Sequence, residues 1–179
     1  MAAKRRDLLV GLMLTELAVV GSTAFATPDE VASDHVRAGN AAIATLINQA
    51  SERSNTFRGL VTTINGSDGL VYIEPGMCEH GMQACLVNVT MAGPTRIVWV
   101  KLHTRGDECD LMGLIGHELQ HTIEVLSNRQ VTSSGALYLF LSQEADAGIS
   151  PAFETIAAKR LGETVRTEVS HKNACAKVR

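Results

Sequence analysis

Apolar residues recur at helical spacing at the start of the chain, then fill short runs, and later return to helical spacing. In residues 28–54 this spacing predicts one helix, broken near Gly39. A second helix is predicted to begin at Ser54 or Asn55 and to end at Asn65-Gly66, because an Asn-Gly pair favours a turn. The first part of the chain is therefore expected to be helical scaffolding.

The middle of the chain has the short apolar runs that are typical of strands. They predict strands at residues 69–74, 85–92 and 95–103, the last two joined by a turn at Gly93-Pro94. In residues 97–102 nearly every position is apolar, so this strand is expected to be central or covered on both faces, with Trp99 in the core. We therefore expect an α+β fold in which a small, mainly antiparallel sheet packs on helices.

Residues 110–128 predict a helix with two different faces. His117 and His121 fall on one side of a helical wheel, and the large apolar residues fall on the opposite side. Asp110 is the expected N-cap, and Asn128 can adopt the left-handed conformation that ends a helix. This helix is the candidate centre of the functional site.

Gly113 and Gly116 are poor helix formers, yet they lie on or beside the histidine side of this helix. The missing side chains leave room for a metal-bound substrate or for a crossing backbone. His117, Glu118 and His121 form an H-E-x-x-H string, in which two imidazoles one helical turn apart can bind one zinc ion. Glu118 is then the candidate general base. Ordinary, partly buried histidines are the alternative interpretation.

The composition is that of a globular chain, with 179 residues of which 45% are hydrophobic, 20% charged and 4% aromatic. Residues 1–26 resemble an export signal, because a basic start precedes an apolar run over 8–20 and an Ala24-Phe25-Ala26 cleavage site. Glu16 interrupts the apolar run, and an uncleaved anchor is the competing interpretation. We expect a signal peptide at 1–26, one domain at 27–179, and export to the periplasm or the medium.

The net charge of −3 and the lack of a basic patch argue against a nucleic-acid partner. Since no other stretch reaches membrane-spanning length, no stable membrane insertion is expected after cleavage. Four cysteines in an exported chain favour two disulfides, and we expect Cys78 with Cys85 and Cys109 with Cys175. A zinc site built from Cys78, His80 and Cys85 is the alternative.

Catalytic zinc normally has three protein ligands and a water, so the two histidines need a third residue. The long metzincin motif is excluded, because Glu124 and Ser127 occupy the places of its glycine and last histidine. A glutamate further along the chain is the other source, either Glu144 or Glu154. We favour Glu154, because it is expected in the first turn of a helix that starts near Ser150-Pro151.

A resemblance to a known group of proteins extends over residues 34–169. The matching residues are Gly116-His117-Glu118-Leu119-Gln120-His121, Glu124-Val125 and Phe153-Glu154-Thr155, followed by Ala158, Gly162, Val165 and Glu168. In these residues the chain resembles small exported bacterial proteins that are similar to gluzincin-type zinc metallopeptidases. The resemblance implies a zincin-like minimal domain with zinc on His117, His121 and Glu154, and Glu118 as general base.

The sequence thus predicts a zinc-dependent hydrolase that cleaves a peptide bond in a peptide or protein substrate. Glu118 would take a proton from the zinc-bound water and pass it to the leaving amine. Tyr138 and His171 are candidates for stabilising the oxyanion, and Glu124 is either a hydrogen-bond partner of a zinc ligand or a solvated carboxylate. The alternative function is a non-catalytic exported protein that keeps the H-E-x-x-H helix for zinc binding or as a scaffold.

Overall fold

The computed structural model describes most of the chain. The described residues are 35–144, 154–172, 175 and 177–178. They belong to one compact unit, Val31–Arg179. The side chains of His80 and Glu144 are not described. The predicted signal peptide at 1–26 and the predicted helix start at Ser150-Pro151 lie outside the described residues.

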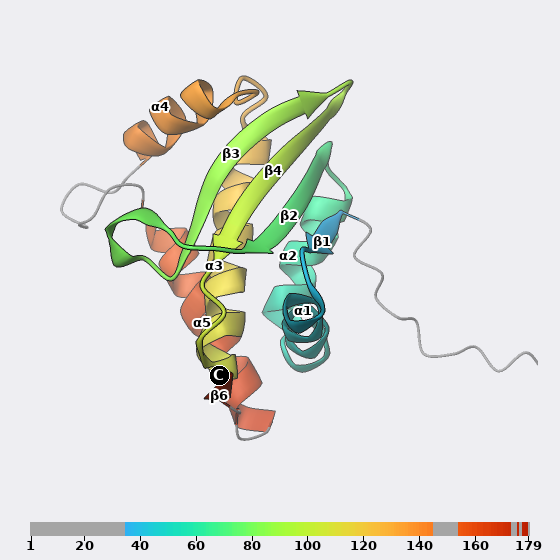
Figure 1. The fold of residues 1–179 in the computed structure, drawn as a ribbon. Helices are drawn as coiled ribbons and strands as arrows, with labels where there is room; N and C mark the ends of the chain where they lie inside the picture. Colours follow the sequence, from blue (N-terminus) through green and yellow to red (C-terminus); the bar gives the residue numbers. More distant parts are fainter. Residues whose placement is uncertain (1–34, 145–153, 173–174, 176, 179) are drawn as a thin grey trace, which may run out of the picture. The chain divides into compact units, whose positions relative to one another are not determined.

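The fold of this unit is α+β, as predicted (Figure 1). The helices are α1 (Ala41–Arg53), α2 (Asn55–Asn65), the 3-10 turn η1 (Glu79–Gly81), α3 (Glu108–Ser127), α4 (Ser134–Glu144) and α5 (Ile156–Lys172). The strands are β1 (Val36–Ala38), β2 (Gly69–Pro75), β3 (Ala84–Ala92), β4 (Thr95–Leu102), β5 (Gly106–Asp107) and β6 (Lys177–Val178). None of the described helices combines the length and the hydropathy that a membrane span requires.

The first predicted helix is shorter than expected, and the second is confirmed. α1 begins after Asn40, whose side chain caps it by accepting a hydrogen bond from the Ile43 N–H at 2.9 Å. The residues before this cap form β1, which is too short to produce a visible periodic pattern. α2 spans the predicted residues and is capped by Ser54, which accepts from the Phe57 N–H at 2.9 Å.

Glu168 ties α5 to the start of α2. Its carboxylate accepts hydrogen bonds from Ser54 Oγ at 2.5 Å, from Thr56 N at 3.1 Å and from Thr56 Oγ1 at 2.9 Å. Burial raises the pKa of Glu168, but the hydrogen bonds outweigh this effect and hold the pKa below its ordinary value. The ionised carboxylate is therefore favoured at the N-terminal end of α2, where the helix dipole also stabilises negative charge.

The main sheet has the strand order β1-β2-β4-β3 and is mixed (Figure 1). β1 and β4 both run parallel to β2, while β3 runs antiparallel to β4. The prediction of a mainly antiparallel sheet is therefore wrong. The predicted hairpin does form at Gly93-Pro94, with Gly93 at a φ of 61°. However, β3, the strand that follows β2 in the chain, does not pair with β2. β4 pairs with β2 instead, and β3 lies at the edge of the sheet.

Only one face of this sheet is buried. Trp99 lies on the other face, where it is partly exposed and stacks on Tyr72 of β2 with ring centroids 4.9 Å apart. The expectation that Trp99 lies in the core is wrong. The two stacked rings cover part of each other's apolar area, so this face of the sheet needs no layer of helices over it. The buried face of β4 consists of Arg96, Val98, Val100 and Leu102.

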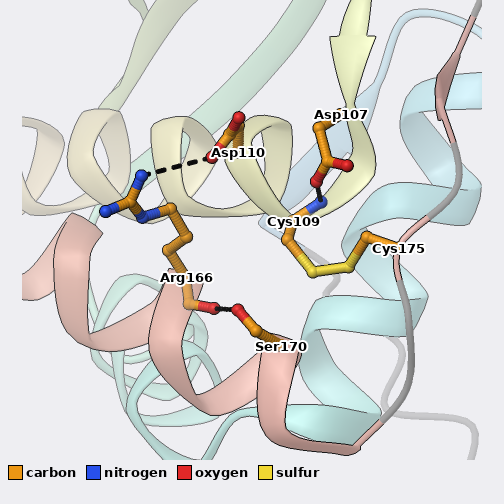
Figure 2. Close-up of a disulfide and its surroundings, with 6 residues drawn as sticks. All are labelled: Asp107, Cys109, Asp110, Arg166, Ser170 and Cys175. Atoms are coloured by element: carbon orange, nitrogen blue, oxygen red, sulfur yellow. Dashed lines mark hydrogen bonds and ion pairs between the residues drawn. A yellow bond between two sulfur atoms is a disulfide. The ribbon is translucent and has the colours of Figure 1, made fainter.

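α3 begins earlier than predicted. Its N-cap is Asp107, whose carboxylate accepts a hydrogen bond from the Cys109 N–H at 2.9 Å, whereas Asp110 lies inside the first turn. The expectation of an N-cap at Asp110 is therefore wrong by one helical turn. Asp110 instead lies 3.4 Å from Arg166 of α5 (Figure 2).

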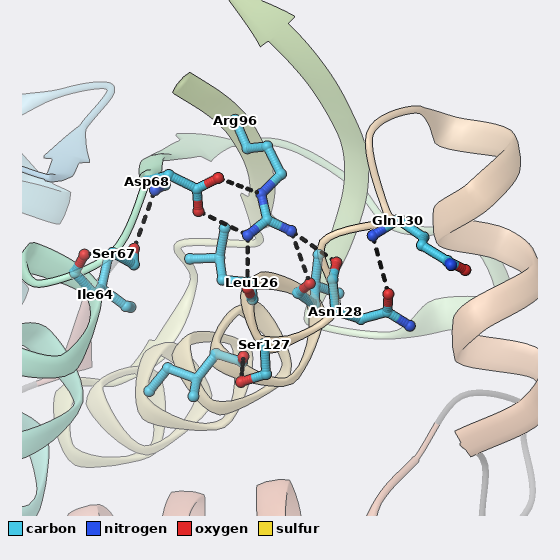
Figure 3. A network of polar contacts seen from close by, with 11 residues as sticks. Ile64, Ser67, Asp68, Arg96, Leu126, Ser127, Asn128 and Gln130 are labelled. Atoms are coloured by element: carbon cyan, nitrogen blue, oxygen red, sulfur yellow. Dashed lines mark hydrogen bonds and ion pairs between the residues drawn. The ribbon is translucent and has the colours of Figure 1, made fainter. Parts of the chain in front are cut away.

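The C-terminal end of α3 is held by Arg96 of β4 and not by a left-handed residue. Asn128 has an extended conformation, with φ −101° and ψ 103°, so the expectation of a left-handed Asn128 is wrong. The Arg96 guanidinium donates hydrogen bonds to the carbonyl groups of Val125, Leu126 and Asn128 at 3.1, 2.6 and 2.8 Å (Figure 3). It also pairs with Asp68 at 2.7 Å. One buried cation therefore satisfies the last carbonyl groups of the helix.

Both predicted disulfides are confirmed, Cys78 with Cys85 and Cys109 with Cys175. The second joins the first turn of α3 to the C-terminal segment, next to the small β5–β6 sheet (Figure 2). Because Cys78 and Cys85 are bonded to each other, they offer no thiolate to a metal. The alternative zinc site built from these cysteines and His80 is therefore wrong.

Candidate metal centre

Three glycines allow α3 and α5 to approach closely beside the histidines. A Cβ on Gly113 would lie 3.0 Å from the Gly162 carbonyl oxygen, and one on Gly116 would lie 2.9 Å from Val165 Cγ2. A Cβ on Gly162 would lie 3.0 Å from His117 Cβ. The space beside the histidines was predicted to hold either a metal-bound substrate or a crossing backbone. The backbone of α5 is what occupies it. The close contact brings the start of α5 to the histidine face of α3.

His117, His121 and Glu154 direct their ligand atoms to one point. The Nε2 atoms of His117 and His121 are 3.1 Å apart, and His117 Nε2 is 3.4 Å from Glu154 Oε1. The three ligand atoms all lie within 4.8 Å of one another. Two ligands at about 2.0–2.1 Å from a tetrahedral zinc ion are about 3.3 Å apart, so the donor types and the two separations that involve His117 fit zinc.

Glu154 lies just before α5, not in its first turn as predicted. The next residue, Thr155, acts as the cap, because its Oγ1 accepts a hydrogen bond from the Ala158 N–H at 3.1 Å. The carboxylate is therefore carried by a fixed helix start. The side chain of Glu144, the other candidate ligand, lies outside the described residues.

Glu124 contacts His121, a candidate ligand, and is not a solvated carboxylate. Its Oε2 lies 2.9 Å from Nδ1 of His121, while its Oε1 accepts hydrogen bonds from Gln120 at 3.1 Å and from Thr155 at 2.9 Å. A carboxylate at Nδ1 favours the tautomer that keeps the proton there and leaves the Nε2 lone pair free for a metal. Burial raises the pKa of Glu124, but the hydrogen bond from His121 and those from its other partners lower it below the ordinary value.

Glu118 lies beside the three candidate ligands, His117, His121 and Glu154, and is 5% exposed. Burial raises the pKa of its carboxyl group above the ordinary value, against the charges of His121 and His117, which lower it. For His117, burial lowers the pKa, but the hydrogen bond to Glu154 and the charges of Glu118, Glu154 and Glu124 outweigh burial and raise it. The acidic groups around the two imidazoles therefore favour a cation at this point.

A cleft of about 400 Å³ lies beside His117, His121 and Glu154. Glu118, His121 and Glu154 line it from α3 and the segment just before α5, Leu141 lines it from α4, and residues 84–87 line it from β3. Neither proposed oxyanion stabiliser is among its lining residues. Tyr138 lies on α4 with 62% exposure, and His171 lines a separate hollow with Cys109 and Cys175.

The structure adds groups that the sequence did not identify. The Leu86 backbone N–H of β3 lowers the pKa of Glu118 by a hydrogen bond, so the edge strand contacts the candidate base. Thr155 links the start of α5 to Glu124. The threonine before an apolar helical pattern is a recognisable cap signal, whereas the contact of Leu86 depends on the strand order and has no sequence signal.

Comparison with known proteins adds no relative: no family model, no curated protein and no solved structure matches this chain.

Proposed function

We propose that this protein is a zinc-dependent peptidase of the gluzincin type. The observation that carries the proposal is the convergence of His117 Nε2, His121 Nε2 and Glu154 Oε1 next to the buried Glu118 at the side of a cleft. Among the described residues the cluster supplies three ligands, which leaves a tetrahedral position for water. A purely structural zinc site would be closed by a fourth protein ligand.

When bound, zinc would lower the pKa of its water and polarise the scissile carbonyl group. Glu118 would accept the proton of the attacking water and pass it to the leaving amine. Its burial supports this role, because desolvation raises the pKa of the carboxyl group and makes it a better base. Glu124 would hold the ring of His121, and the Leu86 N–H would hold the carboxylate of Glu118.

The edge strand β3 supports a peptide as substrate. β3 pairs only with β4 among the described strands, and its residues 84–87 line the cleft beside Glu118. An extended peptide can add to such an edge through main-chain hydrogen bonds. The register shift between Leu86 and Asn88 is a bulge at this position, and bulges at sheet edges re-aim local groups towards a site.

We further propose that the protein acts outside the cytoplasm. The two disulfides support this location, because disulfides persist in oxidising compartments. A test is the size and the N-terminal sequence of the protein recovered from the periplasm or the medium. Cleavage after Ala26 is expected, and an intact N-terminus on a cytoplasmic protein would contradict export.

The peptidase proposal is tested by measuring zinc content and peptide hydrolysis on the same samples. The wild type should carry one zinc ion per chain and cleave members of a peptide library detected by mass spectrometry. Glu118→Gln should keep the zinc and lose about 10²–10⁴-fold in turnover, because general-base catalysis is worth that much. His117→Ala should lose the zinc, and Glu52→Gln on the exposed surface of α1 is the matched control.

Each contrary result has a defined meaning. Unchanged turnover of Glu118→Gln at full zinc content would exclude Glu118 as the base. Bound zinc without cleavage of any peptide would favour the non-catalytic zinc-binding protein over the peptidase. A wild type without zinc would exclude the metal centre itself.

A further inference from the structure

The cleft has an apolar part that is separate from the metal ligands. Met82 lines it from the loop that the Cys78–Cys85 disulfide closes, and Met77 lines it from the position just before that loop. The remaining charged groups of the lining, Glu79 and Lys101, have opposite signs, so they give no net preference for a charged ligand. The apolar residues that line the cleft are Met77, Met82, Ala84, Leu86, Val87 and Leu141.

Two of these side chains are unusually exposed. Met77 is 70% exposed and Val87 is 40% exposed, while Leu141, which also lines the cleft, is 8% exposed. Exposed apolar side chains that gather at the mouth of a concave site are typical of binding surfaces, because a ligand that covers them removes apolar area from water. Met91, exposed to 46% on the same strand β3, does not line the cleft.

The apolar part of the cleft is held in shape by local constraints. The disulfide closes the loop around η1, and the loop turns at Gly81, whose φ is 74°. On the other side, Ser134 at the start of α4 donates a hydrogen bond to Asn88 of β3. α4 also packs into the core through Leu137, which is 4% exposed. Walls that are fixed before binding lose little entropy when a ligand enters.

We propose that the cleft selects an extended polypeptide segment by one large apolar side chain, which binds against Met77, Met82 and Leu141. The inference rests on the proposed function and names the substrate class of that site. The segment would lie along the free edge of β3, and the apolar side chain would enter between the disulfide loop and α4. The site therefore prefers a leucine or phenylalanine beside the peptide bond that is cleaved, and it disfavours small or charged residues at that position.

The test measures binding separately from cleavage. Zinc-loaded Glu118→Gln protein is titrated into fluorescent peptides that differ only in one central residue, namely Leu, Phe, Ala, Asp or Lys, and the anisotropy is recorded. Leu and Phe peptides should bind at least about tenfold more tightly than the others, since each methylene in an apolar pocket contributes about 10–200-fold in discrimination. Met77→Ser together with Met82→Ser should remove most of this difference, and Met91→Ser should keep it.

Equal affinity for all central residues would overturn the inference, and so would a preference that survives the double substitution. Because Met77 is mostly exposed, the single variant Met77→Ser provides the test if the double variant fails to fold. Wild-type protein tested on the same peptides separates this inference from the peptidase. A preference in binding without any hydrolysis would overturn the peptidase alone, whereas hydrolysis with no side-chain preference would overturn only the substrate class.

Discussion

Replacing Arg96 by Met tests how the C-terminal end of α3, the helix of the candidate metal site, is stabilised. Arg96 is 1% exposed and donates to three carbonyl groups at the end of α3, besides pairing with Asp68 (Figure 3). The last turn of α3 has no basic residue of its own. Methionine keeps much of the apolar stem but removes every donor. The Val125 and Asn128 carbonyl groups keep the backbone N–H groups of Asn128 and Val131, whereas the buried Leu126 carbonyl group loses its Arg96 donor.

The expected cost follows from the hydrogen bonds that the buried guanidinium makes to the end of α3. Removing a donor so that a buried acceptor is left unsatisfied costs about 1–3 kcal/mol of unfolding free energy. In a domain of this size each kcal/mol lowers the melting temperature by roughly 2–4 °C, so Arg96→Met should lower it by roughly 2–12 °C. The side chain of Asp68 is 48% exposed, and solvent screening reduces the value of its charge. Asp68→Asn should therefore cost no more than about 1 kcal/mol.

Thermal and urea denaturation of the two variants, with Arg160→Met on the exposed surface of α5 as control, measures the difference. The control should change the free energy of unfolding by less than about 0.5 kcal/mol. If Arg96→Met costs no more than Asp68→Asn, the carbonyl groups of α3 are satisfied in another way and the reasoning fails. Zinc content of the folded Arg96→Met protein should stay unchanged, because the ligands lie more than one turn away from the end of the helix.

Glu124→Gln should weaken zinc binding about 10–100-fold, because a neutral amide supports the histidine ligand less than a carboxylate does; competition with a chelator measures this, and an unchanged affinity would contradict the role of Glu124. Gly116→Ala should lower the free energy of unfolding by about 1–3 kcal/mol through overpacking, since its Cβ would lie 2.9 Å from a side chain of α5. Gly59→Ala, with nothing within 4 Å, is the control, and it should stabilise α2 by about 0.5–1 kcal/mol; equal effects in denaturation would argue against the tight contact. Glu168→Gln should be less stable than the wild type at neutral pH, because the lowered pKa of Glu168 makes its ionised form stabilising. This advantage is present above the unfolded pKa of about 4.3 and is lost as the pH falls through the lower folded pKa, so a difference that persists at the lowest accessible pH would refute it.

The features that could be predicted from the sequence are those that depend on residues close together in the chain. The spacing of His117 and His121 places both imidazoles on one side of a helix without any tertiary information. The end of α2 and the turn at Gly93-Pro94 were predictable for the same reason, because Gly and Asn act locally. The even cysteine count in a chain with an apparent signal was enough to predict two disulfides, whereas the count does not determine which cysteines pair.

The features that could not be predicted depend on partners far away in the chain. The Asn128 conformation was predicted from the intrinsic preference of asparagine, but Arg96 comes from β4 and removes the need for a left-handed cap. The parallel pairing of β4 with β2 follows from the path of the chain after β2, which hydrophobic spacing does not encode. Glu154 was predicted inside a helix because Thr155, the actual cap, was not recognised as the start of α5.

The order in which the chain is made sets a limit on when the metal centre can form. α5 supplies the surface that covers Gly113 and Gly116, and Cys175 supplies the bond that secures the first turn of α3. Both are synthesised after the two histidines, since α5 begins at Ile156 and Cys175 follows it. A nascent chain that ends before α5 therefore leaves Gly113 and Gly116 uncovered and leaves Glu154 without the helix that holds it in place. Formation of the proposed metal centre must therefore await synthesis of α5, and a chain truncated before α5 should bind zinc only weakly.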